Sequence, residues 1–242
     1  MGLDQPAVVQ YFNWVDGLVH GDLGRSFFTN KSVMDQLVKR IPISLKLAGF
    51  SMLLTILFGV GFGILMAVRK DRLLDHVLGT FSTAALSVPG FWIAIVLIFL
   101  FAEQWKLLPS SGISGGSGFI LPAVTLALPS IGVCARLTRS AILDEIGRQY
   151  MTVADAKGMS RRHAVVCHAF GNALIPIITY LGNHMAGIIG GASIVETIFA
   201  IPGIGSYAIA GVQSKDYYVV QAYVLFSGCI YVLTNILIDL IY

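Results

Sequence analysis

The side chains that could most readily bind a solute or a metal are polar groups inside or beside an apolar stretch. Asn183 and His184 lie near the middle of residues 169–195, which contain no Asp, Glu, Lys or Arg, and Glu196 follows directly. An imidazole titrates near neutral pH and binds metals, and an ionisable group at membrane depth points to function. We expect these three residues to lie on a path for a solute. A neutral, hydrogen-bonded histidine is the alternative for His184.

Acidic residues are rare in the loops on the external side of the membrane. After Glu103, the only acids in the loops that we place on the external side of the membrane are Glu196 and Asp216. They could pair with a soluble partner or attract cations. Ordinary solvation at the surface is the alternative for both.

Other patterns argue against catalysis by this chain. His163 and His168 are five residues apart without an HExxH motif, and Cys134, Cys167 and Cys229 are scattered without CxxC spacing. No GxxxxGK[ST] motif is present to hold the phosphates of ATP. We therefore expect no enzyme, no cofactor and no firm metal site in this chain, with His184 as a transient metal ligand at most.

The elements that must position these residues are long apolar segments. The chain is 56% hydrophobic and 12% charged, against about 25% charged residues in soluble domains. Charge is missing from residues 47–68, 77–102, 119–135, 169–195 and 217–238, and about 20 apolar residues cross a bilayer. The sequence predicts an all-α, multi-pass membrane protein with five transmembrane helices. A net charge of +3 gives no reason to expect nucleic acid.

Basic residues predict which loops face the cytoplasm. Arg69, Lys70 and Arg72 follow the first apolar stretch, and a longer basic segment follows the third. This places residues 1–42 on the external side of the membrane and residues 43–242 in a transmembrane domain. Because no export signal precedes the outer segment, we expect a further helix upstream in the complete protein, which would then have six spans.

The outer segment has an amphipathic pattern. Apolar residues recur there at helical spacing, with polar residues between them; the apolar residues are Val8, Tyr11, Phe12, Val15, Leu18 and Val19. A short helix on the outer membrane surface is one interpretation. Packing against the external loops is the other.

Two further patterns concern the spans themselves. Pro89, Pro122 and Pro129 each remove a helix hydrogen bond. Small residues recur every four positions and predict close helix contacts; they are Gly59 and Gly63, then Gly182, Ala186 and Gly190, then Gly187 and Gly191.

The longest cytoplasmic segment, at about residues 140–170, predicts two short helices. Residues 150–157 can form one helix that Gly158 ends, and Ser160 can cap the next. A compact knob of this kind offers a surface to a soluble partner. A solvated basic loop is the alternative.

At this point the chain resembles the permease subunits of ATP-binding-cassette importers, most closely the dipeptide, oligopeptide and nickel group. The resemblance covers essentially the whole chain. It lies in the segments ADAKGMS (154–160), HAFGNALIP (168–176), GGASIVETIFAIPGIG (190–205), KDYYVVQ (215–221) and NILIDLIY (235–242). The upstream segments GLDQPAVVQYFNWV and GDLGRSFF are similar to the external part of these permeases.

The resemblance implies a type I importer fold and a coupling helix that docks on an ATPase subunit. It also implies a second homologous permease, two ATPase subunits that bind ATP and Mg²⁺, an external binding protein, and a place in the bacterial cytoplasmic membrane. Thr152 and Val153 stand where the broader importer motif has Glu and Ala, which is typical of this group. The residues that would form the coupling contact are Ala154, Ala156, Lys157, Gly158, Arg161 and Arg162.

The cargo is the least determined feature. The resemblance implies that nickel permeases tend to carry histidine at the position of His184, whereas peptide permeases tend to carry glutamine. Imidazole suits nickel, so the sequence favours nickel or a related metal chelate, with peptides as the alternative. A passive channel and a membrane-embedded enzyme are the rival classes, and neither needs an ATPase-docking knob.

Overall fold

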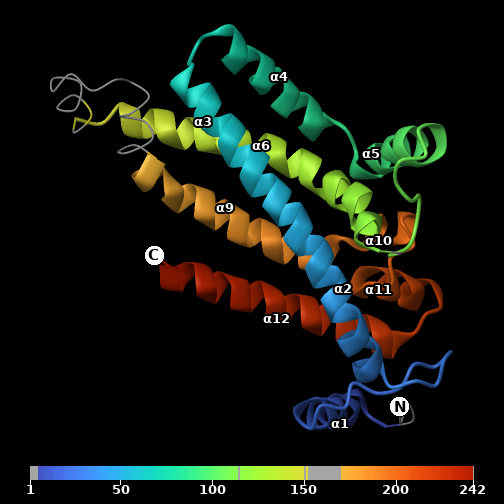
Figure 1. Cartoon of the computed structure of the whole chain (residues 1–242). Helices are drawn as coiled ribbons and strands as arrows, with labels where there is room; N and C mark the ends of the chain where they lie inside the picture. Colours follow the sequence, from blue (N-terminus) through green and yellow to red (C-terminus); the bar gives the residue numbers. More distant parts are fainter. Residues whose placement is uncertain (1–4, 114, 150, 152–169, 242) are drawn as a thin grey trace.

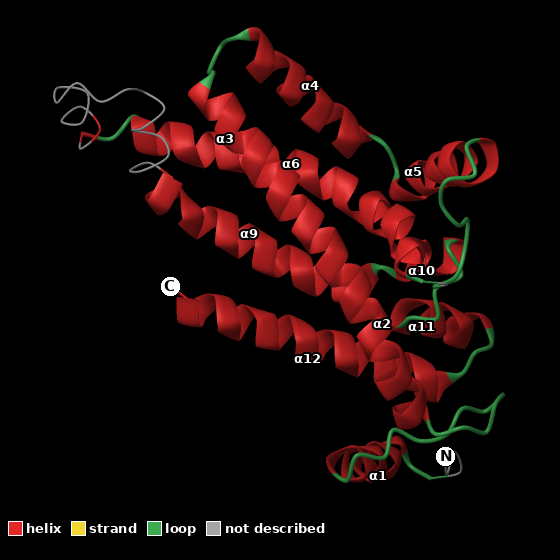
Figure 2. Cartoon of the chain, in the orientation of Figure 1, coloured by secondary structure: helices red, strands yellow, loops and turns green. Residues whose placement is uncertain are grey.

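The computed structural model describes residues 5–113, 115–149, 151 and 170–241. Within these ranges the elements are helices, apart from one isolated bridge between Arg25 and Ser32. The predicted all-α class is confirmed (Figure 2). The elements are α1 (Ala7–Val19), α2 (Val33–Leu54), η1 (Thr55–Val60), α3 (Gly61–Val68), α4 (Leu73–Ser87), α5 (Gly90–Leu97), η2 (Ile98–Gln104), η3 (Gly116–Phe119), α6 (Ile120–Ile146), α9 (Phe170–Gly191), α10 (Ser193–Ile198), α11 (Ile204–Gln213) and α12 (Tyr217–Ile241).

Helix α6 is the centre of the bundle. It contacts α2, η1, α3, α4, α5 and α9, and α9 in turn packs on α12 (Figure 1). The short elements α10 and α11 lie at the end of the bundle nearer α1, away from the described ends of α6 and α9 that flank residues 152–169. Following the charge distribution of the loops, we call the end with α10 and α11 the predicted outer end. The end where α6 and α9 flank residues 152–169 is the predicted inner end.

The number of spans differs from the predicted five. Among the described residues, three helices are long and apolar enough to cross a membrane: Val33–Val68, Gly116–Ile146 and Tyr217–Leu240. A fourth is reached if Leu73–Ser87 and Gly90–Gln104 count as one span. The remaining predicted stretch corresponds to α9, a 22-residue helix between α6 and α12. Its polar residues, Thr179, Asn183 and His184 among them, lower its mean hydropathy.

The prolines act differently from one another. The predicted stretch 77–102 breaks before Pro89, where α4 and α5–η2 meet at 101°, and Val88 is extended at φ −92° and ψ 125°. A residue before proline avoids the helical region, so the chain turns there. Pro122 lies in the first turn of α6, where its missing N–H costs nothing. Pro129 and Pro176 are accommodated inside α6 and α9.

Three of the small-residue positions hold helices close together, as predicted. A Cβ on Gly59 would lie 2.7 Å from the Cβ of Cys134, and one on Gly63 would collide with Thr138, so α6 approaches both backbones closely. Gly182 faces Ile238 of α12 at similarly short range. Gly187 differs, because nothing lies within 4 Å of the position of its Cβ. That part of the predicted pattern is not used for packing within the described residues.

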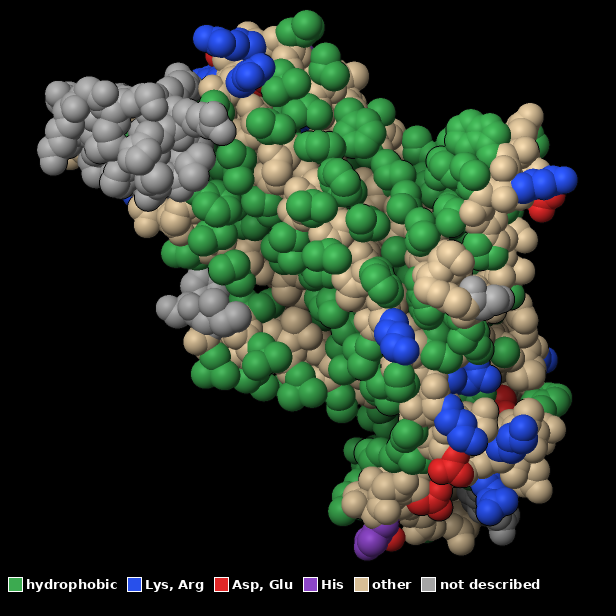
Figure 3. Space-filling view, in the orientation of Figure 1, with side chains coloured by type: hydrophobic (Ala, Val, Ile, Leu, Met, Phe, Trp, Pro, Cys, Tyr) green, Lys and Arg blue, Asp and Glu red, His purple; other side chains and the backbone are tan. Residues whose placement is uncertain are grey.

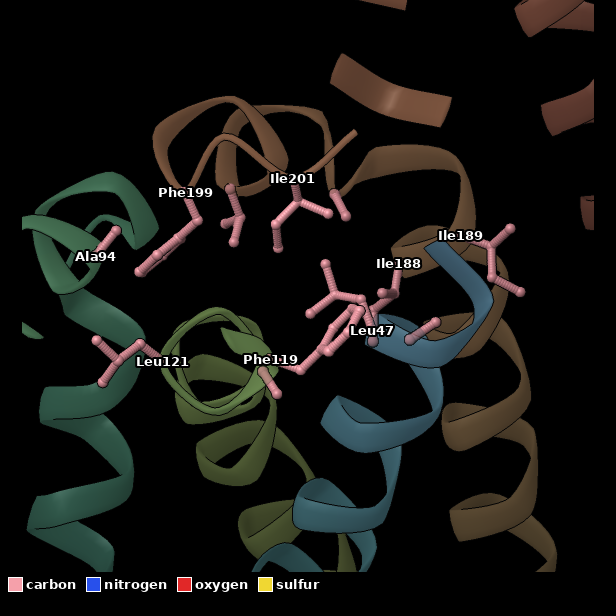
Figure 4. Packing of buried hydrophobic residues seen from close by; sticks show 12 residues of the cluster. Leu47, Ala94, Phe119, Leu121, Ile188, Ile189, Phe199 and Ile201 are labelled. Carbon is pink, nitrogen blue, oxygen red and sulfur yellow. The ribbon is translucent and has the colours of Figure 1, made fainter. Parts of the chain in front are cut away.

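The main apolar core lies at the predicted outer half of the bundle. Leu47 of α2, Ala94 of α5, Leu121 of α6 and Ile188 of α9 converge there with Phe199, which follows α10 (Figure 4). Phe199 is 1% exposed. This core fixes the α10–α11 region against the long helices.

Candidate functional site

The predicted coupling residues cannot be placed. Ala154, Ala156, Lys157, Gly158, Arg161 and Arg162 lie outside the described residues, as does most of the predicted knob at about 140–170. Their part in coupling stays a prediction.

The helices on either side of that segment are firmly joined. Ala67 of α3, Ile142 of α6, Ala173 and Ile177 of α9, and Met151 form one buried apolar cluster. Met151 is 2% exposed. A force applied between residues 151 and 170 would therefore act on α6 and α9 together.

His184 lies in a half-buried aromatic environment on α9. Its ring stacks on Tyr180 with centroids 5.7 Å apart and planes 4° apart. The Tyr180 hydroxyl donates to the carbonyl oxygen of Ser130 on α6 over 3.3 Å. Nε2 of His184 is buried and has no hydrogen-bond partner among the described residues. Nowhere in the described residues do three His, Cys, Asp or Glu side chains gather where they could hold a metal.

Asn183 points to different surroundings from its neighbour. It is exposed, and so is Gly187 one turn further along α9. This face of α9 is therefore not covered by the described residues, whereas His184 lies against Tyr180. The structure thus separates the two residues that the sequence placed together, and their role in a solute path stays a prediction.

Glu196 of α10 is buried, and its carboxylate is hydrogen-bonded to both α2 and α11. One carboxylate oxygen accepts from the Ser44 hydroxyl on α2 over 2.6 Å, and the other accepts from the backbone N–H of Ser206 on α11 over 2.9 Å. The Ser44 oxygen also accepts from the N–H of Ile204 over 2.9 Å. The carboxylate therefore sits at the N-terminus of α11, where negative charge is favoured. Gly203 leaves room for it, because a Cβ there would overlap the carboxylate.

The pKa of the Glu196 carboxyl lies above its ordinary value, because burial outweighs the opposing effects. Burial raises the pKa of the Glu196 carboxyl, and the hydrogen bonds from Ser44 and Ser206 and the charge of Arg40 lower it. Arg40 lies over the Tyr207 ring, 4.6 Å from its centroid, and donates to the carbonyl oxygen of Gly203 at 3.5 Å. Burial also raises the pKa of the Tyr207 hydroxyl. A buried carboxyl with these partners is a structural joint between α2, α10 and α11.

Asp216 forms a second joint at the predicted outer end. It accepts from the Ser26 hydroxyl over 2.6 Å and from the N–H of Phe27 over 3.1 Å. Glu196 and Asp216 are only 1% and 2% exposed. The surface position expected for both acids is therefore wrong: within this chain they are covered and hydrogen-bonded, which leaves them poorly placed to meet a soluble partner.

Sequence reasoning missed a charged pair that joins two helices. Asp75 of α4 and Arg139 of α6 form a bidentate ion pair, with Nε–Oδ1 and Nη2–Oδ2 distances of 2.7 Å. Both residues lie just outside the uncharged stretches, on the side to which the basic loops belong. Opposite charges at the same end of neighbouring spans were the signal that could have indicated the pair.

The outer helix α1 forms as the amphipathic pattern predicted. Its apolar residues stay uncovered, since Val8, Tyr11 and Phe12 are 60–65% exposed. A groove of about 670 Å³ separates α1 from the start of α12, with Tyr11, Trp14 and Tyr218 among its walls. The described external loops do not cover Val8, Tyr11 and Phe12, and a position on the outer membrane surface stays a prediction.

Several helices of the bundle are long and apolar enough to span a membrane, which indicates a multi-pass membrane protein. Residues 59–242 match the family described as "Binding-protein-dependent transport system inner membrane component", and the chain belongs to that family. The resemblance drawn from the sequence is confirmed.

Curated relatives cover the whole chain. It is 36% identical over 271 residues to the probable D,D-dipeptide transport system permease protein of Escherichia coli K12, with 80% of that protein covered. It is 38% identical over 250 residues to a probable peptide ABC transporter permease of Sinorhizobium fredii, again with 80% covered. The glutathione transport system permease of Escherichia coli O6:H1 is 34% identical over 242 residues, with 79% covered.

Solved structures support the fold. A methionine ABC transporter chain in an inward-facing conformation matches with a TM-score of 0.71 at 17% identity, covering 86% of this chain and 95% of that one. An amino acid ABC transporter chain matches with a TM-score of 0.69 at 17% identity, covering 86% and 92%. The predicted type I permease fold is confirmed.

Proposed function

We propose that this chain is the permease subunit of an ATP-driven importer of short peptides in a bacterial cytoplasmic membrane. The observation that carries the proposal is similarity over the whole chain, at 34–38% identity, to relatives named as dipeptide, peptide and glutathione permeases. The family description, which includes binding-protein dependence, supports an external binding protein as a partner.

The relatives favour peptides over the nickel cargo that His184 suggested. The geometry agrees with this choice in one respect. Within the described residues His184 stacks on Tyr180, and no group of three His, Cys, Asp or Glu side chains gathers where it could hold a metal. A single imidazole does not make a nickel site.

The proposed mechanism is a switch between two packings of the helix bundle. Two partner ATPase subunits would close on ATP and move the segment between α6 and α9. Since α3, α6 and α9 share one buried cluster, we expect them to move as one body. A second, homologous permease would cover the exposed face of α9 that carries Asn183. A peptide biases this switch only if it binds the two states with different affinity.

Uptake by cells that carry the complete transporter tests the cargo. We expect labelled dipeptide to accumulate and labelled nickel not to. His184→Gln should keep at least about half of the peptide uptake, because glutamine can occupy this half-buried position, and the exposed His20→Gln serves as the control. Nickel uptake that His184→Gln abolishes and His20→Gln preserves would restore the metal interpretation.

A further inference from the structure

A cationic groove lies between α3, α4 and α6 at the predicted inner end. It has a volume of about 520 Å³, and its walls include Asp75, His76, Thr80, Thr83, Arg136 and Arg139. None of these residues takes part in the joints at Glu196 and Asp216. The groove shares the Asp75–Arg139 ion pair described above but lies apart from both of those joints.

One arginine in the groove is neutralised and the other is free. Arg139 is held by Asp75 through two bonds of 2.7 Å, and Asp75 also accepts from the N–H of Asp71 over 3.0 Å. Arg136, one turn earlier on α6, is exposed and has no ion pair or side-chain hydrogen bond among the described residues. The groove thus carries an unpaired guanidinium next to an exposed imidazole, His76.

The surface beside the groove is apolar and uncovered. Leu73, Val77 and Phe81, spaced one turn apart on α4, are 79%, 54% and 41% exposed. Beyond them lies the basic loop with Arg69, Lys70 and Arg72. Figure 3 shows Lys and Arg side chains gathered at the α3–α4 end, next to hydrophobic surface. A cationic groove bordered by an apolar helix face suits a molecule with an anionic head and a hydrocarbon tail.

We propose that this groove binds the headgroup of an anionic phospholipid of the inner leaflet, with Arg136 facing the phosphate. Guanidinium groups bind phosphate oxygens through charge-assisted hydrogen bonds. Basic pockets between transmembrane helices on the cytoplasmic side are known to suit such headgroups. The acyl chains would lie along Leu73, Val77 and Phe81.

Lipid retention by the purified complete transporter tests the proposal. The transporter is exchanged into mixtures of phosphatidylglycerol and phosphatidylcholine, and the lipids that remain bound are counted by native mass spectrometry. We expect Arg136→Gln to lower the preference for phosphatidylglycerol about fivefold, the effect of one basic residue near a membrane surface. Arg148→Gln is the matched control, because Arg148 is on the segment after α6 and pairs with Glu145 at 3.2 Å.

Two outcomes would overturn the proposal. One is an unchanged phosphatidylglycerol preference in both Arg136→Gln and a second variant, His76→Gln. The other comes from a photoreactive residue placed at Thr80. Crosslinking to lipid supports the proposal, whereas crosslinking to another subunit would make this groove a protein contact.

Discussion

At the residue scale, Glu196 of α10 is a buried carboxyl that connects three helical elements. Its carboxylate accepts from Ser44 of α2 and from the backbone of Ser206 in α11. A buried donor that loses its acceptor costs more than the bond itself contributed. The position of α11 against α2 should therefore depend on this one side chain.

We predict that Glu196→Ala lowers the stability of the protein by about 1.5–3 kcal/mol, the range for hydrogen bonds to charged groups. Thermal unfolding of the purified transporter, followed by tryptophan fluorescence, measures the change. Glu103→Ala is the control, since Glu103 is exposed. Equal unfolding temperatures for the two variants would show that Glu196 is not a joint.

The same residue predicts a pH dependence. Burial raises the pKa of Glu196 in the folded protein above its ordinary value of 4.5. The folded state then holds the proton more tightly than the unfolded state, so stability falls as pH rises through the folded pKa. Glu196→Gln cannot titrate, and the unfolding temperature of the native protein should fall relative to that variant as the pH rises above 4.5. A difference that grows in favour of the native protein over this range would contradict the raised pKa.

At the scale of the elements, close contact between α3 and α6 depends on glycine. Gly63 faces Thr138 and the carbonyl oxygen of Ala135, which would lie 2.7 Å from an added Cβ. Gly61, two residues earlier, has nothing within 4 Å. The two positions offer a matched comparison on one continuous helix.

We predict that Gly63→Ala reduces the amount of folded protein in the membrane and its unfolding temperature, because the methyl group forces α3 away from α6. Gly61→Ala should have no such effect, since alanine is the better helix former by about 1 kcal/mol. Fluorescence-detected size exclusion measures both. If Gly63→Ala behaves like Gly61→Ala, the close packing of these helices is not required.

The ion pair between α4 and α6 gives a second prediction at this scale. Asp75 is 6% exposed and Arg139 is 30% exposed, between the conditions of surface and buried pairs. We expect Asp75→Asn to cost about 1–3 kcal/mol, and Asp75→Asn combined with Arg139→Gln to cost less than the sum of the single changes. Additive losses in unfolding experiments would show that the two side chains do not stabilise each other.

The elements also show how far sequence reasoning reached. The uncharged stretches predicted helices correctly, because lipid leaves few other structures for an apolar backbone. They did not predict the 101° turn at Pro89, since Pro129 and Pro176 have the same chemistry and are accommodated within helices. Neighbouring helices decide such outcomes. The burial of Glu196 was hidden for the same reason: Ser44 is 152 residues away in the chain.

At the scale of the whole molecule, the chain is a bundle of helices, and its sequence contains no GxxxxGK[ST] motif for binding ATP. The residues expected to couple it to an ATPase lie between α6 and α9, whose inner halves share a buried cluster with α3. In the proposed mechanism, movement of the segment between α6 and α9 by an ATPase acts on α3, α6 and α9 together. In the proposed function, a second permease covers the exposed face of α9 and completes the peptide path.

The most direct test of this account is peptide uptake into proteoliposomes that contain the complete transporter and its binding protein. We predict uptake that requires ATP and the ATPase subunits, and that Gly158→Arg abolishes without loss of the permease from the membrane. Uptake by the permease subunits alone, with no nucleotide present, would contradict the claim that this protein is driven by its partners.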